Sequence, residues 1–228
     1  MTLKPLPGLI AALLLGGCNV VTSTDPWFTD ADAAGAASLR TGVWTLSGLD
    51  KPCRFDDRRP IETWPECAGP ILVREHDILS FDEPAAETPR RGSPRPWDSM
   101  AFVLAAGSPR ILQTAPSAKD LRSRPEGSRT YLYQGLEPLR FDPQGRIVAF
   151  TLSFVVCDGK TISRSRRGDA DATAAQADEP IRPLAGLTMD AAGEGCIAQS
   201  KVALVNAAKV SAPNATYARS RWVRDGER

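Results

Sequence analysis

The sequence predicts a mainly β protein, an antiparallel meander or barrel-like sheet with one late α-helix (α+β) and two disulfides. Three observations lead to this fold class. Short runs of alternating apolar and polar residues recur along the chain, separated by segments rich in Gly and Pro. One stretch, after residue 200, has the spacing of a helix packed on a sheet. Beyond the N-terminal segment the chain carries an even set of cysteines, which in an exported protein indicates disulfides.

Residues 1–17 have the layout of a secretory signal peptide. Lys4 precedes an apolar run over residues 9–15, and the small residues Gly16 and Gly17 follow it. At about seven residues, this run is far shorter than the roughly 20 that a helix needs to cross a bilayer. We therefore expect these residues to direct export rather than to span a membrane.

The next residue is a cysteine, and Leu15-Gly16-Gly17-Cys18 resembles the lipobox of bacterial lipoproteins. The resemblance implies that the chain is cut before Cys18, which then carries acyl chains such as palmitate and anchors the protein to the membrane. Asn19 stands where an Asp would favour the inner membrane, which favours the outer membrane of the cell envelope, facing the periplasm. The alternative is an ordinary signal peptide with a chance cysteine near its end.

The charge of the chain is nearly balanced, with 28 Lys and Arg against 27 Asp and Glu. This balance argues against nucleic acid as a partner. Arginines nevertheless gather in two places, which we interpret as a solvated Pro-rich loop and a solvated C-terminal tail. The first group is Arg90, Arg91 and Arg95, and the second is Arg219, Arg221, Arg224 and Arg228.

The four cysteines after Cys18 allow three disulfide pairings. We favour Cys53–Cys67 with Cys157–Cys196, because each of these pairs brackets a loop-like stretch. The cysteine spacings match no zinc pattern, so no metal site is expected.

In the first half of the chain, residues 18–38 are small, polar and acidic, and predict a lipid-anchored tether. A single β-rich periplasmic domain is then expected over residues 39–228. Its first strand is predicted at 39–46, and a charged, Pro-rich loop closed by the first disulfide follows. Further strands are predicted at 71–73, 78–81, 100–104 and 110–113, with loops at 83–97 and 115–128.

The second half of the chain contains the clearest hairpin. Strands ending at Phe141 and beginning at Arg146 flank Asp142-Pro143-Gln144-Gly145, which has the composition of a type I turn. Residues 158–195 predict a flexible loop whose two ends are joined by the second disulfide. A helix from Ser200 to Lys209, stopped by Pro213, and a last strand at 219–223 complete the prediction.

The sequence contains no recognisable catalytic constellation. His76 is the sole histidine, and its neighbours Glu75 and Asp77 would point to the opposite strand face, so the three predict a polar turn. No nucleophile elbow, P-loop, dinucleotide fingerprint or zinc-protease motif is present. We therefore expect no catalytic residue and no cofactor. The leading hypothesis is a non-enzymatic envelope protein that binds an envelope partner or supports the envelope, and a hydrolase using paired carboxylates is the weakest alternative.

One further resemblance concerns the first predicted strand. Gly42-Val43-Trp44 resembles the Gly-x-Trp that opens lipocalins and other calycin barrels. The resemblance implies a closed barrel that carries a small apolar ligand. In that family an Arg near the last strand packs across the Trp, a part that Arg219 or Arg221 would take here.

Overall fold

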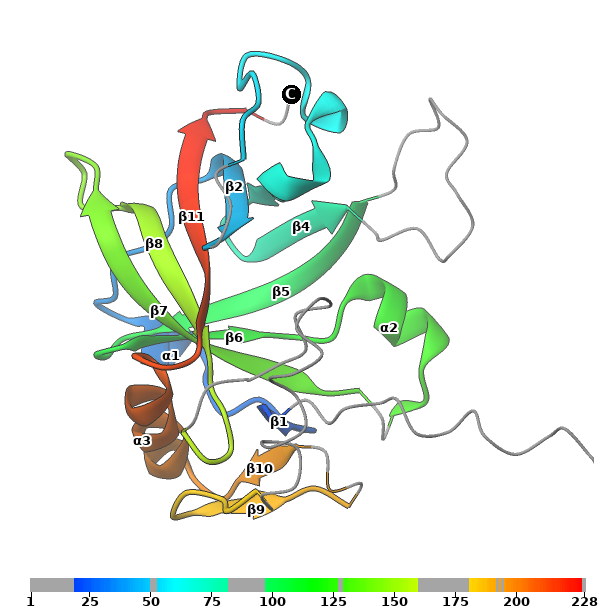
Figure 1. The fold of residues 1–228 in the computed structure, drawn as a ribbon, viewed down its shortest axis with the longest axis vertical. Coiled ribbons are helices and arrows are strands. Elements are labelled where there is room, and N and C mark those ends of the chain that lie inside the picture. Colours follow the sequence, from blue (N-terminus) through cyan, green and yellow to red (C-terminus); the bar gives the residue numbers. More distant parts are fainter. Residues whose placement is uncertain are drawn as a thin grey trace, which may run out of the picture.

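The computed structural model describes residues 19–49, 53–81, 97–126, 129–159, 181–191, 193 and 195–226 (Figure 1). The predicted signal peptide, Cys18 and residues 160–180 of the predicted flexible loop therefore lie outside the described residues.

The core of the fold is a closed, eight-stranded antiparallel barrel, which confirms the predicted fold class. Its strands follow one another around the barrel in chain order, and β11 fits between β8 and β2 to close it. The pairing of β6 with β7 completes the ring. The barrel strands are β2 (Gly42–Gly48), β3 (Pro70–Val73), β4 (Asp77–Phe81), β5 (Trp97–Ala105), β6 (Arg110–Thr114), β7 (Tyr131–Phe141), β8 (Ile147–Phe154) and β11 (Thr216–Arg224).

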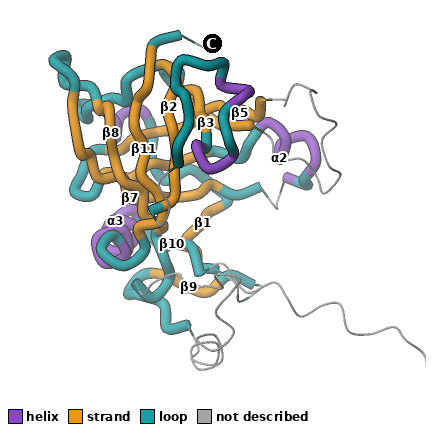
Figure 2. Tube along the Cα trace, turned by 45° about the horizontal axis from the view of Figure 1, so that its top comes forward, coloured by secondary structure: helices purple, strands orange, loops and turns teal. Residues whose placement is uncertain are grey.

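Three more strands extend the sheet beside β7, namely β1 (Val21–Ser23), β9 (Leu187–Met189) and β10 (Cys196–Ala198). β1 pairs antiparallel with the start of β7 and parallel with β10, and β10 pairs with β9 (Figure 2). The predicted tether is therefore wrong for residues 20–38. They are short of large apolar side chains, but Val21 and Phe28 are buried and β1 satisfies its backbone hydrogen bonds in the sheet.

The chain between β8 and β11 forms part of this extension. β9 lies inside residues 158–195, so the predicted flexible loop is corrected at its C-terminal end. The predicted late helix is confirmed as α3 (Lys201–Ser211), and the Ser200 hydroxyl caps it by accepting a hydrogen bond from the Ala203 amide at 3.1 Å. Shorter helices are α1 (Asp30–Ala33), α2 (Ala118–Ser123), η1 (Ile61–Thr63) and η2 (Glu66–Ala68). Within the described residues, no helix has the length and hydropathy needed to cross a membrane.

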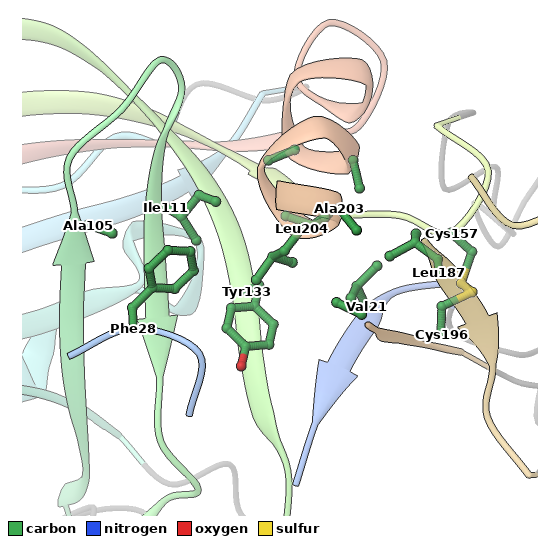
Figure 3. Packing of buried hydrophobic residues seen from close by; sticks show 14 residues of the cluster. Val21, Phe28, Ala105, Ile111, Tyr133, Cys157, Leu187, Cys196, Ala203 and Leu204 are labelled. Atoms are coloured by element: carbon green, nitrogen blue, oxygen red, sulfur yellow. A yellow bond between two sulfur atoms is a disulfide. The ribbon is translucent and has the colours of Figure 1, made fainter. Parts of the chain in front are cut away.

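Buried apolar residues form three clusters, one inside the barrel and two on its outer faces. On one outer face α3 and the N-terminal segment cover β5, β6 and β7, with Phe28 and Leu204 near Ile111 and Tyr133 (Figure 3). On the other, residues 53–68 cover β2, β3 and β4. Several strands therefore carry apolar residues on both faces, since one face lies in the barrel interior and the other is covered by these outer segments.

Both predicted disulfides are present, Cys53–Cys67 in the loop before β3 and Cys157–Cys196 between the end of β8 and β10. Cys157 and Cys196 are fully buried next to Val21 (Figure 3). The second disulfide therefore ties the added strands to the barrel.

Candidate functional site: the mouth of the barrel

The register of the strands shows which side chains point into the barrel, because directly paired residues share a face of the sheet. Trp44 pairs with Ile71 on one side and with Trp222 on the other, and all three belong to the interior cluster. We call the end of the barrel where β2 stops at Gly48 and β8 stops at Phe154 the mouth. The opposite end, which holds the β3–β4 and β7–β8 turns, is the closed end.

The closed end is sealed around Trp44, which is fully buried. Its indole Nε1 donates a hydrogen bond to the carbonyl of Arg40 at 2.8 Å, and its ring lies 5.2 Å from that of Phe150. The guanidinium of Arg40 in turn lies 3.6 Å from the centre of the Trp222 ring. Leu39 and Ile147 complete this apolar seal.

The arginine expected to pack across the Trp is not on the last strand. Arg219 and Arg221 pair with Ser47 and Thr45 on the outer face of the barrel, so neither can reach Trp44 from inside. A cation that does stack on a Trp at the closed end is Arg40, which precedes β2 and lies over Trp222. This part of the expectation is therefore corrected.

At the mouth, the interior apolar side chains are only partly covered. They are contributed by four strands and pack against the margin of the interior cluster, whereas Leu39, Trp44 and Ile147 nearer the closed end are buried. These mouth residues are Leu46, Ile71, Met100, Phe102 and Tyr217. Phe154 joins them, because its ring stacks on that of Tyr217 with 4.0 Å between the centroids. The interior thus has a buried apolar cluster around Trp44 and partly buried apolar side chains at the mouth.

Few polar groups accompany these side chains. The Gln134 Nε2 donates a hydrogen bond to the hydroxyl of Tyr217 at 2.7 Å. The hydroxyl end of Tyr217 is shielded from water, and this desolvation raises the pKa of the phenol above its ordinary value. Asp98 pairs with Ser80 on the same face and accepts a hydrogen bond from the Lys119 amide at 3.0 Å, which ties α2 to the start of β5. Such a site suits an apolar ligand with one hydrogen-bonding group.

The polar turn predicted at residues 75–77 lies between β3 and β4. His76 and Glu75 are largely exposed at the β3–β4 turn, with 3.8 Å between Nε2 and Oε1, and the Arg74 amide donates to the carbonyl of Asp77 across this turn. Across the part of the chain that the structure describes, no three His, Cys, Asp or Glu side chains are grouped to hold a metal ion.

The sequence did not single out Met100, Phe102 or Tyr217, because an apolar residue on a strand has the same pattern whether it faces a packed core or a mouth. Comparison with known proteins adds no assignment: no protein family, no curated protein and no solved structure matches the chain.

Proposed function

We propose that this protein is a non-enzymatic, lipid-anchored protein of the bacterial cell envelope that binds a small apolar ligand in the mouth of its barrel. The observation that carries the proposal is the contrast between the two ends of one interior. Trp44, Leu39 and Ile147 are buried, while Leu46, Met100 and Phe102 on the same interior face are only partly buried. Partly exposed apolar side chains at the end of a barrel are stabilised when a ligand removes them from water.

The first described residue after the proposed anchor, Asn19, lies at the mouth end of the barrel. Asn19, which directly follows Cys18, accepts a hydrogen bond from the Cys157 amide at 3.1 Å, and Cys157 is three residues past Phe154. β1 also pairs with the first residues of β7, where that strand starts at the mouth. Acyl chains on Cys18 would therefore hold the mouth close to the bilayer, from which an apolar ligand can enter.

Ligand binding is tested with the neutral probe N-phenyl-1-naphthylamine, whose fluorescence rises in apolar surroundings. We expect saturable binding, and we expect Phe102→Ser to weaken it roughly tenfold to a hundredfold, the value of one buried Phe side chain. Phe141→Ser is the matched control, since Phe141 is 47% exposed on the β7–β8 hairpin, away from the mouth. Absence of saturable binding, or equal weakening by both substitutions in folded protein, contradicts the ligand site.

Lipidation is tested by the intact mass of the mature protein. We expect a chain that starts at Cys18 and carries acyl chains, and a Cys18→Ser chain that lacks them and leaves the membrane fraction. A mature protein that keeps Met1, or a Cys18→Ser chain that remains membrane-bound without lipid, contradicts the anchor.

A further inference from the structure

A second concave surface lies on the outside of the barrel, where β2, β11, β8 and β7 run side by side. It is a groove of about 350 Å³. Its floor is made of small side chains, Thr45, Ser47 and Ala149, and its walls carry Arg140, Arg219 and Arg221. Two of these arginines belong to the C-terminal group that the sequence assigned to a solvated tail, but both lie within β11.

The strand register places the three arginines around one small area. Arg219 and Arg221 are two residues apart on β11, so they share its outer face about 7 Å apart. Ala149 of β8 pairs with Arg221 on one side and with Arg140 of β7 on the other. Arg140 and Arg221 are therefore separated by two strand spacings, about 10 Å. Each guanidinium can thus reach over the small residues between them.

These charges are poorly neutralised by the protein itself. Within the described residues, neither Arg140 nor Arg219 forms an ion pair, and Arg221 has one long ion pair of 3.9 Å with Asp57 and lies 5.8 Å from the centre of the Phe55 ring. Both partners of that contact are about half-exposed, and such surface pairs contribute little to stability. Glu137 lies on the same outer face opposite Thr151, and it also forms no ion pair among the described residues. The groove is therefore left with a net positive charge.

We propose that this groove binds a phosphate group, as a monoester or a diphosphate. Guanidinium groups match phosphate oxygens with paired hydrogen bonds, and a phosphate offers three terminal oxygens and a charge close to −2 to three arginines. A single carboxylate offers two oxygens and one charge. Leu139, which lines the edge of the groove and is 52% exposed, provides an apolar surface for the rest of the ligand. The phosphate can belong to a soluble molecule or to a lipid headgroup.

The proposal is tested by calorimetry on the mature protein with three probes: inorganic pyrophosphate, monomeric dihexanoyl phosphatidic acid and an octaglutamate peptide. We expect a phosphate probe to bind, and Arg219→Gln and Arg140→Gln each to weaken it at least about tenfold, as loss of a charged hydrogen bond does. Arg122→Gln is the matched control, because Arg122 is exposed on α2, outside the groove.

Each outcome is informative. Tighter binding of pyrophosphate indicates a soluble phosphorylated ligand, and tighter binding of phosphatidic acid indicates a lipid headgroup. No binding of either phosphate probe, tighter binding of octaglutamate than of both, or equal weakening in Arg122→Gln overturns the proposal. None of these results depends on the apolar site at the mouth, because the groove lies on the opposite face of the sheet.

Discussion

Gln113 of β6 holds the N-terminal segment on the barrel, and its replacement by Met tests that role. Its side chain is 3% exposed. The Oε1 accepts hydrogen bonds from the Trp27 and Phe28 amides at 2.8 and 2.9 Å, and the Nε2 donates to the carbonyl of Phe28 at 2.8 Å. Met keeps the volume of the side chain but can form none of these bonds.

The expected cost follows from which groups lose a partner. The Trp27 amide has a second acceptor in the Tyr133 hydroxyl at 3.3 Å, whereas the amide and carbonyl of Phe28 rely on Gln113. Phe28 is buried, and each unsatisfied buried group costs about 1–3 kcal/mol, so Gln113→Met should lower the free energy of unfolding by about 2–6 kcal/mol.

The assay is urea-induced unfolding combined with hydrogen exchange at the Phe28 amide. The control is Gln144→Met, at an exposed position in the β7–β8 turn, which should change stability by less than about 0.5 kcal/mol. A loss below about 1 kcal/mol for Gln113→Met, or a Phe28 amide that stays as protected as before, would refute this account of the segment.

Three further predictions concern a disulfide, an ion pair and a glycine. Replacing Cys157 and Cys196 by Ala should cost about 4 kcal/mol in denaturant unfolding, because this disulfide closes a loop with a sequence separation of 39. The Lys201 ammonium, 2.8 Å from Asp32, holds the pKa of that carboxyl below its ordinary value. The pair therefore stabilises the fold above the unfolded carboxyl pKa of about 3.9 and loses this effect as pH falls through the folded pKa, so Asp32→Asn should lower Tm at pH 7 but not at pH 2. Gly42→Ala should cost at least about 1 kcal/mol, since Gly42 has a φ of 120° and an added Cβ would meet the carbonyl oxygen of Arg224.

Each of these has a matched comparison. Removing Cys53–Cys67, with a separation of 14, should cost about 3 kcal/mol, so a larger loss there than at the other disulfide contradicts the loop argument. An equal drop in Tm for Asp32→Asn at both pH values would mean that the ion pair is not its cause. Gly48→Ala should be nearly neutral, because an added Cβ there has no neighbour within 4 Å.

Local chemistry made several features predictable from the sequence. Period-two alternation located most of the strands, and the turn at Asp142 was predictable from its own residues. There the carboxylate accepts hydrogen bonds from the Gln144 and Arg146 amides at 3.0 and 2.9 Å, and the Gly145 amide donates to the Asp142 carbonyl. The disulfide pairing was also predictable, because each pair closes a segment short in sequence.

The sequence alone could not show which apolar face of a strand lies inside the barrel. Leu112 faces the interior, and its neighbour Ile111 packs outside beneath Phe28 and α3, yet both are buried aliphatic residues. Which face of β6 points into the barrel depends on the segments that cover the outside of the barrel. These segments are residues 19–38 and 201–211, which are far from β6 in sequence.

By itself, the sequence determined most of the barrel strands, the late helix, the hairpin turn and the disulfides, because each depends on residues near one another in the chain. Only the tertiary structure decided that the sheet closes, that one end is sealed by Trp44 and Arg40, and that the other leaves Met100 and Phe102 only partly buried. It also placed Arg140 beside Arg221 across β8. The physical reason is that pairings between distant segments decide whether the sheet closes into a barrel and how exposed a side chain is. The periodicity and composition of a single segment do not depend on those pairings.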